Sequence, residues 1–306
     1  MMAKRNSRRQ APLPSADSGA ARRRPHVRAH RHGHDTYDHD HDHDHRHEYA
    51  HEHDHDQHHD EPHAAGARDI LVVRPTSGLS GDMLLAGLAR MAGATDAELG
   101  EVAASLGLPR DCVTVDPRAL NEVNGWGCRI VLPHEHSHRT MADIRAIIAG
   151  SGLTAAAQSL AIRAFDLLAA AEGRVHGVSP EAVTFHEVGA LDSILDTCLC
   201  AALYDRISPA KFVCGPLPLC DGVVRCDHGL LPVPAPAVLE LLEGVPVRGI
   251  DTFGETVTPT AIAPLKALDA AFGPWPAMTL RARALVYGGN VLPGVANGAI
   301  FALGRA

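Results

Sequence analysis

The stretch DILVVRPTSGLSGDM (residues 69–83) is where an ordered fold first becomes visible in the sequence. Its apolar run at 70–73 is followed by Pro75 and then by small residues, which is typical of a strand, a tight loop and the start of a helix. Apolar residues from Met83 to Met91 recur at helical spacing. The sequence therefore predicts a strand–loop–helix unit at the start of the folded part.

Helical and strand patterns alternate through the rest of the chain. Periodicity and capping signals predict helices at 95–107, 141–148, 154–172, 189–207, 236–242 and 260–272. Branched aliphatic residues predict strands at 113–132 (a hairpin), 212–214, 279–287 and 299–303. The proline-rich residues between 216 and 236 are expected to form an extended loop. Interleaved elements of this kind favour an α/β fold with helices packed on a mixed sheet, a domain that we place at residues 67–306.

Composition excludes several classes of protein. The 306 residues are 45% apolar and 21% charged, which is ordinary for a globular protein. No apolar run approaches the roughly 20 residues that cross a bilayer, so no membrane partner is expected. The cysteines number 7 and form no Cys-x-x-Cys pair, which argues against a disulfide framework and gives little support to a structural zinc site.

Residues 1–31 are predicted to be a disordered basic tail. They hold nine Lys and Arg against one acid, Asp17, and almost no branched aliphatics. No apolar segment follows the arginine clusters, so we expect no cleaved signal peptide and a cytoplasmic location. The basic charge is confined to this segment, so a nucleic-acid partner is not predicted.

Residues 32–66 are predicted to be a disordered metal-binding segment rich in His and Asp. Neutral imidazole binds nickel, copper and zinc, and flexible spacing lets several ligands meet on one ion. The composition does not identify the metal, and a solvated spacer or an expression tag is the alternative interpretation. The candidate ligands are His39, His41, His43, His45, His51, His53 and His55.

The motif FHEVGALDSILD (185–196) is the strongest candidate for a metal site in the folded part. His186 and Glu187 precede a predicted helix, and Asp192 and Asp196, four residues apart, share one face of it. These four side chains are candidate ligands for Mg²⁺, Mn²⁺ or Ni²⁺. His186, Glu187 and Asp192 are also candidate catalytic groups. Helix capping and a buried, ion-paired acid are the structural alternative.

Three further motifs carry candidate binding groups. In SGLSGD (77–82), backbone N–H groups at a helix start can approach an anion, although the Gly-Lys-Ser/Thr ending of a P-loop is absent. Arg225 can hold a phosphate as a fork, and His228 can act as a ligand or a general base. The threonines of TVTPT (256–260) are explained by helix capping alone. The candidate cofactor-binding residues are Ser77, Gly78, Ser80, Gly81, Asp82, Arg225, Thr258 and Thr260.

Taken together, these motifs resemble the LarC family, the nickel insertion proteins of the nickel-pincer nucleotide cofactor pathway. They occur in family order and cover nearly all of residues 69–303. The matching stretches are SGLSGDM (77–83), HRTMADIRAII (138–148), FHEVGALDSILD (185–196), PLPL (216–219), VRCDHGLLPVPAPAVLELLEG (224–244) and TVTPT (256–260).

The resemblance implies a CTP-dependent cyclometallase, an enzyme of the lyase class that uses CTP with Mg²⁺ or Mn²⁺. It would place Ni²⁺ into pyridinium-3,5-bisthiocarboxylic acid mononucleotide, forming one nickel–carbon and two nickel–sulfur bonds. Longer family members continue into a second domain associated with CTP, so a separately encoded CTP-binding domain is an expected partner. A nickel or zinc store or metallochaperone without catalysis is the alternative, and a phosphate-ester hydrolase is a third.

The chain departs from the family pattern at two places that matter for charge. Arg74-Pro75-Thr76 stands where the family has Asp-Cys-Phe, and Val295-Ala296-Asn297 stands where it has Arg-Pro-Asn. The first change puts a cation where an acid is expected beside a possible metal site. The second removes a cation.

Overall fold

The computed structural model describes residues 69–133, 138–185, 188–226 and 228–306. The predictions for residues 1–31 and 32–66, including the seven histidine ligands, lie outside these residues, as do His186 and Glu187. A seven-stranded mixed sheet dominates the described part, in the order β11-β6-β1-β13-β12-β3-β2. Its strands are β1 (Asp69–Pro75), β2 (Val113–Leu120), β3 (Val123–Ile130), β6 (Lys211–Cys214), β11 (Ala271–Phe272), β12 (Thr279–Val286) and β13 (Ala299–Arg305).

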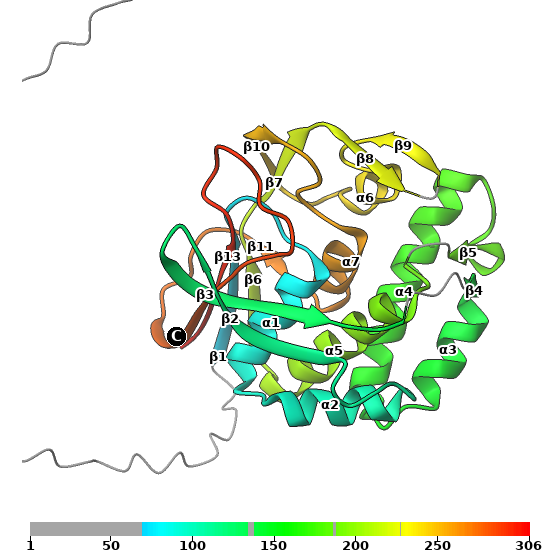
Figure 1. Ribbon diagram of the computed structural model, residues 1–306, viewed down its shortest axis with the longest axis horizontal. Helices are drawn as coiled ribbons and strands as arrows, with labels where there is room; N and C mark the ends of the chain where they lie inside the picture. The colour runs from blue at the N-terminus through cyan, green and yellow to red at the C-terminus, as the bar shows by residue number, and fades with distance from the viewer. Residues whose placement is uncertain (1–68, 134–137, 186–187, 227) are drawn as a thin grey trace, which may run out of the picture. The chain divides into compact units, whose positions relative to one another are not determined.

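Helices pack on this sheet in successive layers (Figure 1). Helix α1 lies on β3, β12 and β13, α5 packs on α1, and α4 packs on α5 and α7. The helices are α1 (Gly81–Ala92), α2 (Asp96–Ser105), α3 (Met141–Ala149), α4 (Ala155–His176), α5 (Leu191–Ile207), α6 (Pro236–Leu241) and α7 (Pro259–Ala267), with a 3₁₀ turn at Pro180–Ala182. The predicted α/β fold with helices on a mixed sheet is confirmed. None of these helices is both long and apolar enough to cross a membrane.

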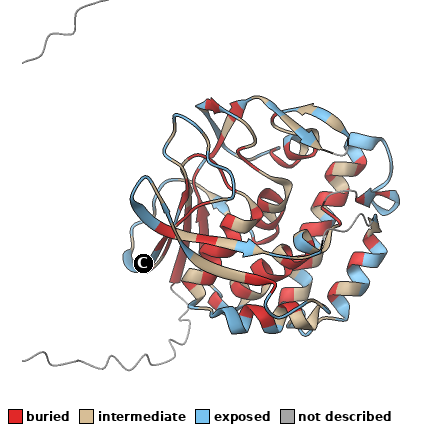
Figure 2. Cartoon of the chain, viewed as in Figure 1, coloured by how far each residue is buried: buried red, intermediate tan, exposed pale blue. Residues whose placement is uncertain are grey.

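The core explains why β1 reads as an unbroken apolar run. Leu71 and Val73 pack into the large core with the helices, whereas Ile70 and Val72 pack into a second cluster with Val213. A central strand buried on both faces needs apolar side chains at every position. Buried residues accordingly concentrate along the sheet and the inner faces of the helices (Figure 2).

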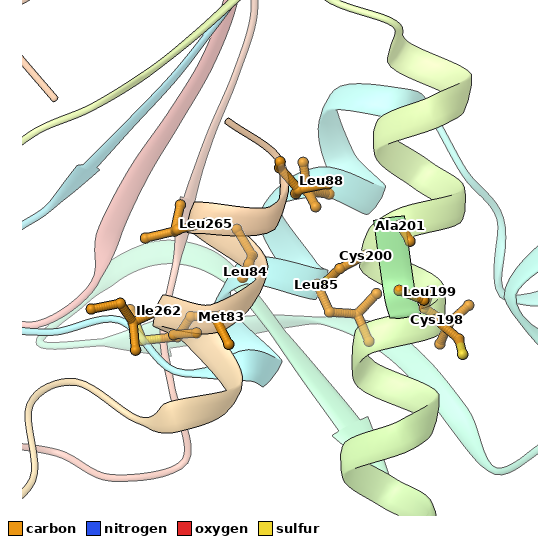
Figure 3. Packing of buried hydrophobic residues seen from close by; sticks show 14 of the residues in the cluster. Met83, Leu84, Leu85, Leu88, Cys198, Leu199, Cys200, Ala201, Ile262 and Leu265 are labelled. Atoms are coloured by element: carbon orange, nitrogen blue, oxygen red, sulfur yellow. The ribbon is translucent and has the colours of Figure 1, made fainter. Parts of the chain in front are cut away.

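Aliphatic side chains and buried thiols join α1, α5 and α7 into one core (Figure 3). Leu84 and Leu85 of α1 lie beside residues 198–201 of α5, and Ile262 and Leu265 of α7 lie against the same helix α1. Aromatic residues make up only 4% of the chain, so Leu, Ile and small residues fill this space. This packing fixes the first turn of α1 relative to α5 and α7.

Local signals set most element boundaries as predicted. Thr95 caps α2 in a capping box with Glu98. The hairpin of β2 and β3 turns at Asn121 and Glu122, whose φ angles are 50° and 63°. The prediction for 260–272 was too long, because α7 ends at Ala267 and the chain then forms β11.

The proline-rich segment is not the extended loop that the sequence suggested. It forms β7 (Leu217–Asp221), β8 (Val223–Cys226) and β9 (Gly229–Pro232), and β7 pairs with β10 (Val247–Phe253). Strands β7 and β10 make one two-stranded sheet and β8 and β9 another; β4 (Arg139–Thr140) and β5 (Thr184–Phe185) make a third. Each strand of such a pair has an open edge, where a proline costs no ladder hydrogen bond.

Candidate functional site

One cavity lies at the N-terminal end of α1 and has a volume of about 230 Å³. We call it the α1 cavity. It brings together two motifs far apart in the sequence, the SGLSGD loop and the TVTPT turn, beneath the loop between β12 and β13. Its lining residues are Ser77, Gly78, Ser80, Asp82, Met83, Leu120, Glu255, Thr256, Thr258, Tyr287, Gly288, Gly289, Asn290, Val291, Leu292, Asn297 and Gly298.

Backbone contacts hold the two motifs side by side. Leu79 pairs with Val257 in a parallel bridge, and the Leu79 N–H donates to the Thr256 carbonyl at 2.8 Å. At Gly78 a Cβ atom would lie 2.2 Å from the same carbonyl oxygen. Glycine is therefore required here for the close approach of the two chains.

Two carboxylates lie at the first turn of α1, and one of them, Asp82, lines this cavity. The Asp82 carboxylate accepts hydrogen bonds from the Ser80 hydroxyl and from the Gly289 N–H at 3.1 Å. Asp196 of α5 lies beneath the first turn of α1, where a Cβ on Gly81 would be 2.7 Å from its Oδ2. Burial, together with the Asp82 and Asp192 carboxylates, raises the pKa of Asp196 well above 3.8. The Asp196 carboxyl is thus held in a state that favours binding a proton or a cation.

The polarity of the α1 cavity suits a cation better than an anion. The charged residues in its described lining are Asp82 and Glu255, with no Lys or Arg among them. Asp82 also offsets the positive end of the α1 dipole. The Thr256 hydroxyl is buried without a hydrogen-bond partner, which is uncommon unless a ligand or water completes the site.

The second cavity lies beneath the β8–β9 hairpin and has a volume of about 310 Å³. We call it the hairpin cavity. Its walls combine apolar side chains with two imidazoles and one guanidinium. Its lining residues are Glu172, Val175, His176, Thr184, Phe185, Val188, Val224, Arg225, Cys226, His228, Leu231, Ala235, Pro236, Ala237, Glu255 and Pro259.

The two imidazoles of the hairpin cavity stack on one another. The ring centroids of His176 and His228 are 5.0 Å apart, with 34° between the ring planes. The His176 Nε2 lies 3.3 Å from the Glu172 Oε2, one turn earlier on α4. Arg225 is exposed and reaches the cavity from β8. A planar ring can stack on such a pair, while the guanidinium can hold an anionic group.

The structure distributes the remaining candidate residues unevenly. Asp192 is exposed, and its Oδ1 accepts the Ser193 N–H at 2.7 Å, so it does not share the burial of Asp196. Thr258 begins α7 without a side-chain cap, and its hydroxyl instead lies 3.0 Å from that of Thr260. The capping explanation of TVTPT was therefore wrong.

Within the part of the chain that the structure describes, no three or more His, Cys, Asp and Glu side chains are grouped so as to hold a metal ion. The seven cysteines form no disulfide bonds. Burial raises the pKa of Cys214 to about 12, so this group remains a thiol. Cys220 donates from its thiol to the Gly254 carbonyl.

Sequence reasoning missed Glu172, His176 and Glu255. Glu172 and His176 are four residues apart at the end of α4. The helix was predicted to stop at residue 172, so His176 was not placed on the same helix as Glu172. Glu255 directly precedes the TVTPT motif, and this adjacency was the available signal.

Of the two departures from the family pattern, the one at Arg74 lies away from the carboxylates and the one at residues 295–297 lies in the loop over the α1 cavity. Arg74 points to the side of the sheet opposite α1, where it donates to the Gly273 carbonyl and lies 5.4 Å from the Trp275 ring. Arg74 is not among the described lining residues of either cavity. Asn297 accepts from the Leu292 N–H and donates to the Leu292 carbonyl, which closes the loop over the α1 cavity.

Comparison with known proteins identifies the family. A family model described as nickel insertion protein matches residues 71–303, which include every described lining residue of both cavities. The chain belongs to the LarC family of nickel insertion proteins. This confirms the resemblance seen in the motifs. No solved structure matches this LarC-family chain.

Curated relatives are 38–40% identical to this LarC-family chain over the aligned residues. A relative from Syntrophotalea carbinolica is 40% identical over 69% of this chain and 53% of its own length. Proteins from Nocardioides sp. (40% identical) and Desulfitobacterium hafniense (38%) are named pyridinium-3,5-bisthiocarboxylic acid mononucleotide nickel insertion protein. The matches cover 68% and 70% of this chain and 53% of each relative. The chain thus spans about half the length of the curated relatives it matches.

Proposed function

We propose that this chain inserts Ni²⁺ into pyridinium-3,5-bisthiocarboxylic acid mononucleotide, or forms the metal- and mononucleotide-binding component of that reaction. The names of the relatives supply the substrate class. The observation that carries the proposal is a pair of adjoining cavities of different chemistry, one lined by acids and hydroxyls and the other by imidazoles and a guanidinium. The nickel ion and the mononucleotide would then each have a binding site in the same domain.

The α1 cavity is the proposed site of the metal. Asp82, Thr256 and Thr258 line the cavity, and the Asp196 carboxylate and Thr260 hydroxyl lie against Gly81 in the adjoining first turn of α1. Hard oxygen ligands bind a borderline ion such as Ni²⁺ less tightly than sulfur does. Nickel held by oxygen ligands can therefore transfer to the thiocarboxylate sulfurs of the substrate. A cluster of cysteine thiolates would hold the ion more tightly and so oppose this transfer.

The hairpin cavity is the proposed site of the mononucleotide. Its pyridinium ring carries positive charge and can stack on His176 and His228, with Glu172 nearby to balance the charge. Arg225 can hold its phosphate through a forked pair of hydrogen bonds. Such an arrangement would place the reacting edge of the ring toward the α1 cavity.

The remaining roles follow from the family and from chemistry. We propose CTP with Mg²⁺ or Mn²⁺ as co-substrate, bound with the help of a further CTP-binding domain, and a cytoplasmic lyase reaction. His186, Glu187 and Asp192 stay candidate metal or proton-transfer groups at the start of α5, with His228 as a candidate base. The histidines between 39 and 55 would gather nickel for delivery to the domain.

Reconstitution with the whole chain tests this function. Protein, NiCl₂, MgCl₂, CTP and the mononucleotide are combined, and the nickel-containing cofactor is measured by absorbance and mass spectrometry. We expect Asp196→Asn and Arg225→Ala to lower the rate by roughly tenfold to a hundredfold. Asp166→Asn is the matched control, because Asp166 pairs with Arg145 on the exposed surface. No cofactor from the wild-type chain together with no binding of NiCl₂ or of the mononucleotide to it, or equal rates for all three variants, would disprove the proposal.

A further inference from the structure

One carboxylate belongs to both cavities. Among the described residues that line the α1 cavity and the hairpin cavity, Glu255 alone is common to the two. The residues that follow it separate the cavities, since Thr256 and Thr258 face the first and Pro259 faces the second. Glu255 therefore lies where a ligand in one cavity meets a ligand in the other.

The backbone on either side of Glu255 is fixed. Gly254 has a φ angle of 117°, which favours glycine, and its carbonyl accepts from the Cys220 thiol. On the other side, the Thr256 carbonyl accepts the Leu79 N–H at 2.8 Å, and the Thr258 N–H donates to the Leu79 carbonyl at 3.3 Å. Hydrogen bonds thus fix the backbone on both flanks of Glu255, whose side chain is half-buried.

The proposed reaction requires a base at such a junction. A nickel–carbon bond forms only when the C4–H bond of the pyridinium ring breaks, so the base must reach both the metal and the ring. Asp82 lines only the α1 cavity. His228 lines only the hairpin cavity. Glu255 meets the geometric requirement from both sides.

We propose that the Glu255 carboxylate accepts the C4 proton of the mononucleotide as nickel binds to that carbon. The electron pair of the C–H bond becomes the nickel–carbon bond, the proton passes to a Glu255 oxygen, and the oxidation state of nickel does not change. The inference rests on the proposed function. Charged and titratable groups in the described linings are Asp82 and Tyr287 on one side and Glu172, His176, Arg225, Cys226 and His228 on the other.

The test compares Glu255→Gln with Glu243→Gln, the same change at an exposed glutamate outside both cavities. General base catalysis contributes roughly a hundredfold to ten-thousandfold, so Glu255→Gln should slow nickel insertion by that range. Calorimetric affinities for NiCl₂ alone and for the mononucleotide alone should remain unchanged. Substrate carrying deuterium at C4 should show a larger isotope effect with Glu255→Gln than with wild type.

Chemical rescue distinguishes a general-base role of Glu255 from a purely structural role. In Glu255→Ala, added formate should restore part of the rate in proportion to its concentration, because a small carboxylate can occupy the vacated volume. A wild-type rate in Glu255→Gln, loss of either ligand affinity, or no formate rescue together with an unchanged isotope effect would overturn the role of Glu255. Failure of the wild-type chain to bind either NiCl₂ or the mononucleotide would instead overturn the proposed function, and this inference with it.

Discussion

The Asp82 Oδ2 accepts the backbone N–H of Gly289 at 3.1 Å, so the first turn of α1 holds the loop between β12 and β13. Asn297 closes the same loop from its other end through two hydrogen bonds to Leu292. The outer wall of the α1 cavity therefore depends on one of the acids that we assign to nickel. Nickel binding and the position of the loop between β12 and β13 are therefore linked through the Asp82 carboxylate.

Two substitutions at Asp82 separate these roles. In Asp82→Ala the Gly289 N–H loses its acceptor, and we expect a loss of about 1–3 kcal/mol in unfolding free energy. Asp82→Asn keeps a carbonyl acceptor and removes the charge, so stability should change less while nickel affinity falls. Urea unfolding and calorimetry with NiCl₂ measure the two quantities. Equal stability of both variants would show that the Gly289 contact does not hold the loop.

Asp196→Asn should stabilise the metal-free protein at neutral pH. The pKa of Asp196 is raised in the folded state, so between the unfolded and folded pKa values the native chain binds more protons. The free energy of unfolding of the wild-type chain therefore falls as pH rises from the unfolded to the folded pKa of Asp196. Asparagine does not ionise, so the variant does not lose this stability. The advantage of the variant should shrink as pH falls toward 3.8 and vanish below it.

Thermal unfolding of wild type and Asp196→Asn across a pH series provides the measurement, with chelator present. Asp166→Asn again serves as the control, because its carboxylate is exposed. A variant less stable than wild type at neutral pH would show that the ionised Asp196 carboxylate is stabilised in the fold. We expect the same variant to insert nickel more slowly, so stability and activity should change in opposite directions.

Gly78→Ala should disrupt the contact between the SGLSGD and TVTPT motifs. The new Cβ would lie 2.2 Å from the Thr256 carbonyl oxygen, and overpacking against backbone costs about 1–3 kcal/mol or more. Gly249→Ala is the control, since a Cβ there meets nothing within 4 Å. Chemical denaturation gives the two free energies. Similar values for both would mean that residues 77–79 can move away from 256–258.

Removal of residues 1–63 tests where the activity resides. Both cavities are lined, in the part described, by residues between 77 and 298, so the shortened chain should still form cofactor when nickel is added in excess. Nickel bound per chain at equilibrium should fall, because the seven histidine candidates are lost. If cofactor formation disappears while the domain remains folded by circular dichroism, delivery by the tract is obligatory. A storage protein would show that result.

Much of the fold could be predicted from the sequence because it depends on interactions between residues close together in the chain. The unbroken apolar run of β1, the capping box at Thr95 and the helical spacing of α4 each depend on neighbours along the chain. The proline-rich segment was misread because strand pairing depends on partners such as β10, which lies some 30 residues beyond β7. An edge strand that tolerates proline has no local signature of its own.

The sequence by itself determined the family, the order of the motifs and some of the groups that face the two cavities, such as Asp82, Arg225 and His228. Only the tertiary structure decided that Asp196 is enclosed beside Asp82 while Asp192 is exposed, although the two acids occupy the same helix face. It also turned Arg74 away from the acids and set Glu255 between the cavities. The physical reason is that burial and charge coupling act across space, whereas sequence spacing records only distance along the chain.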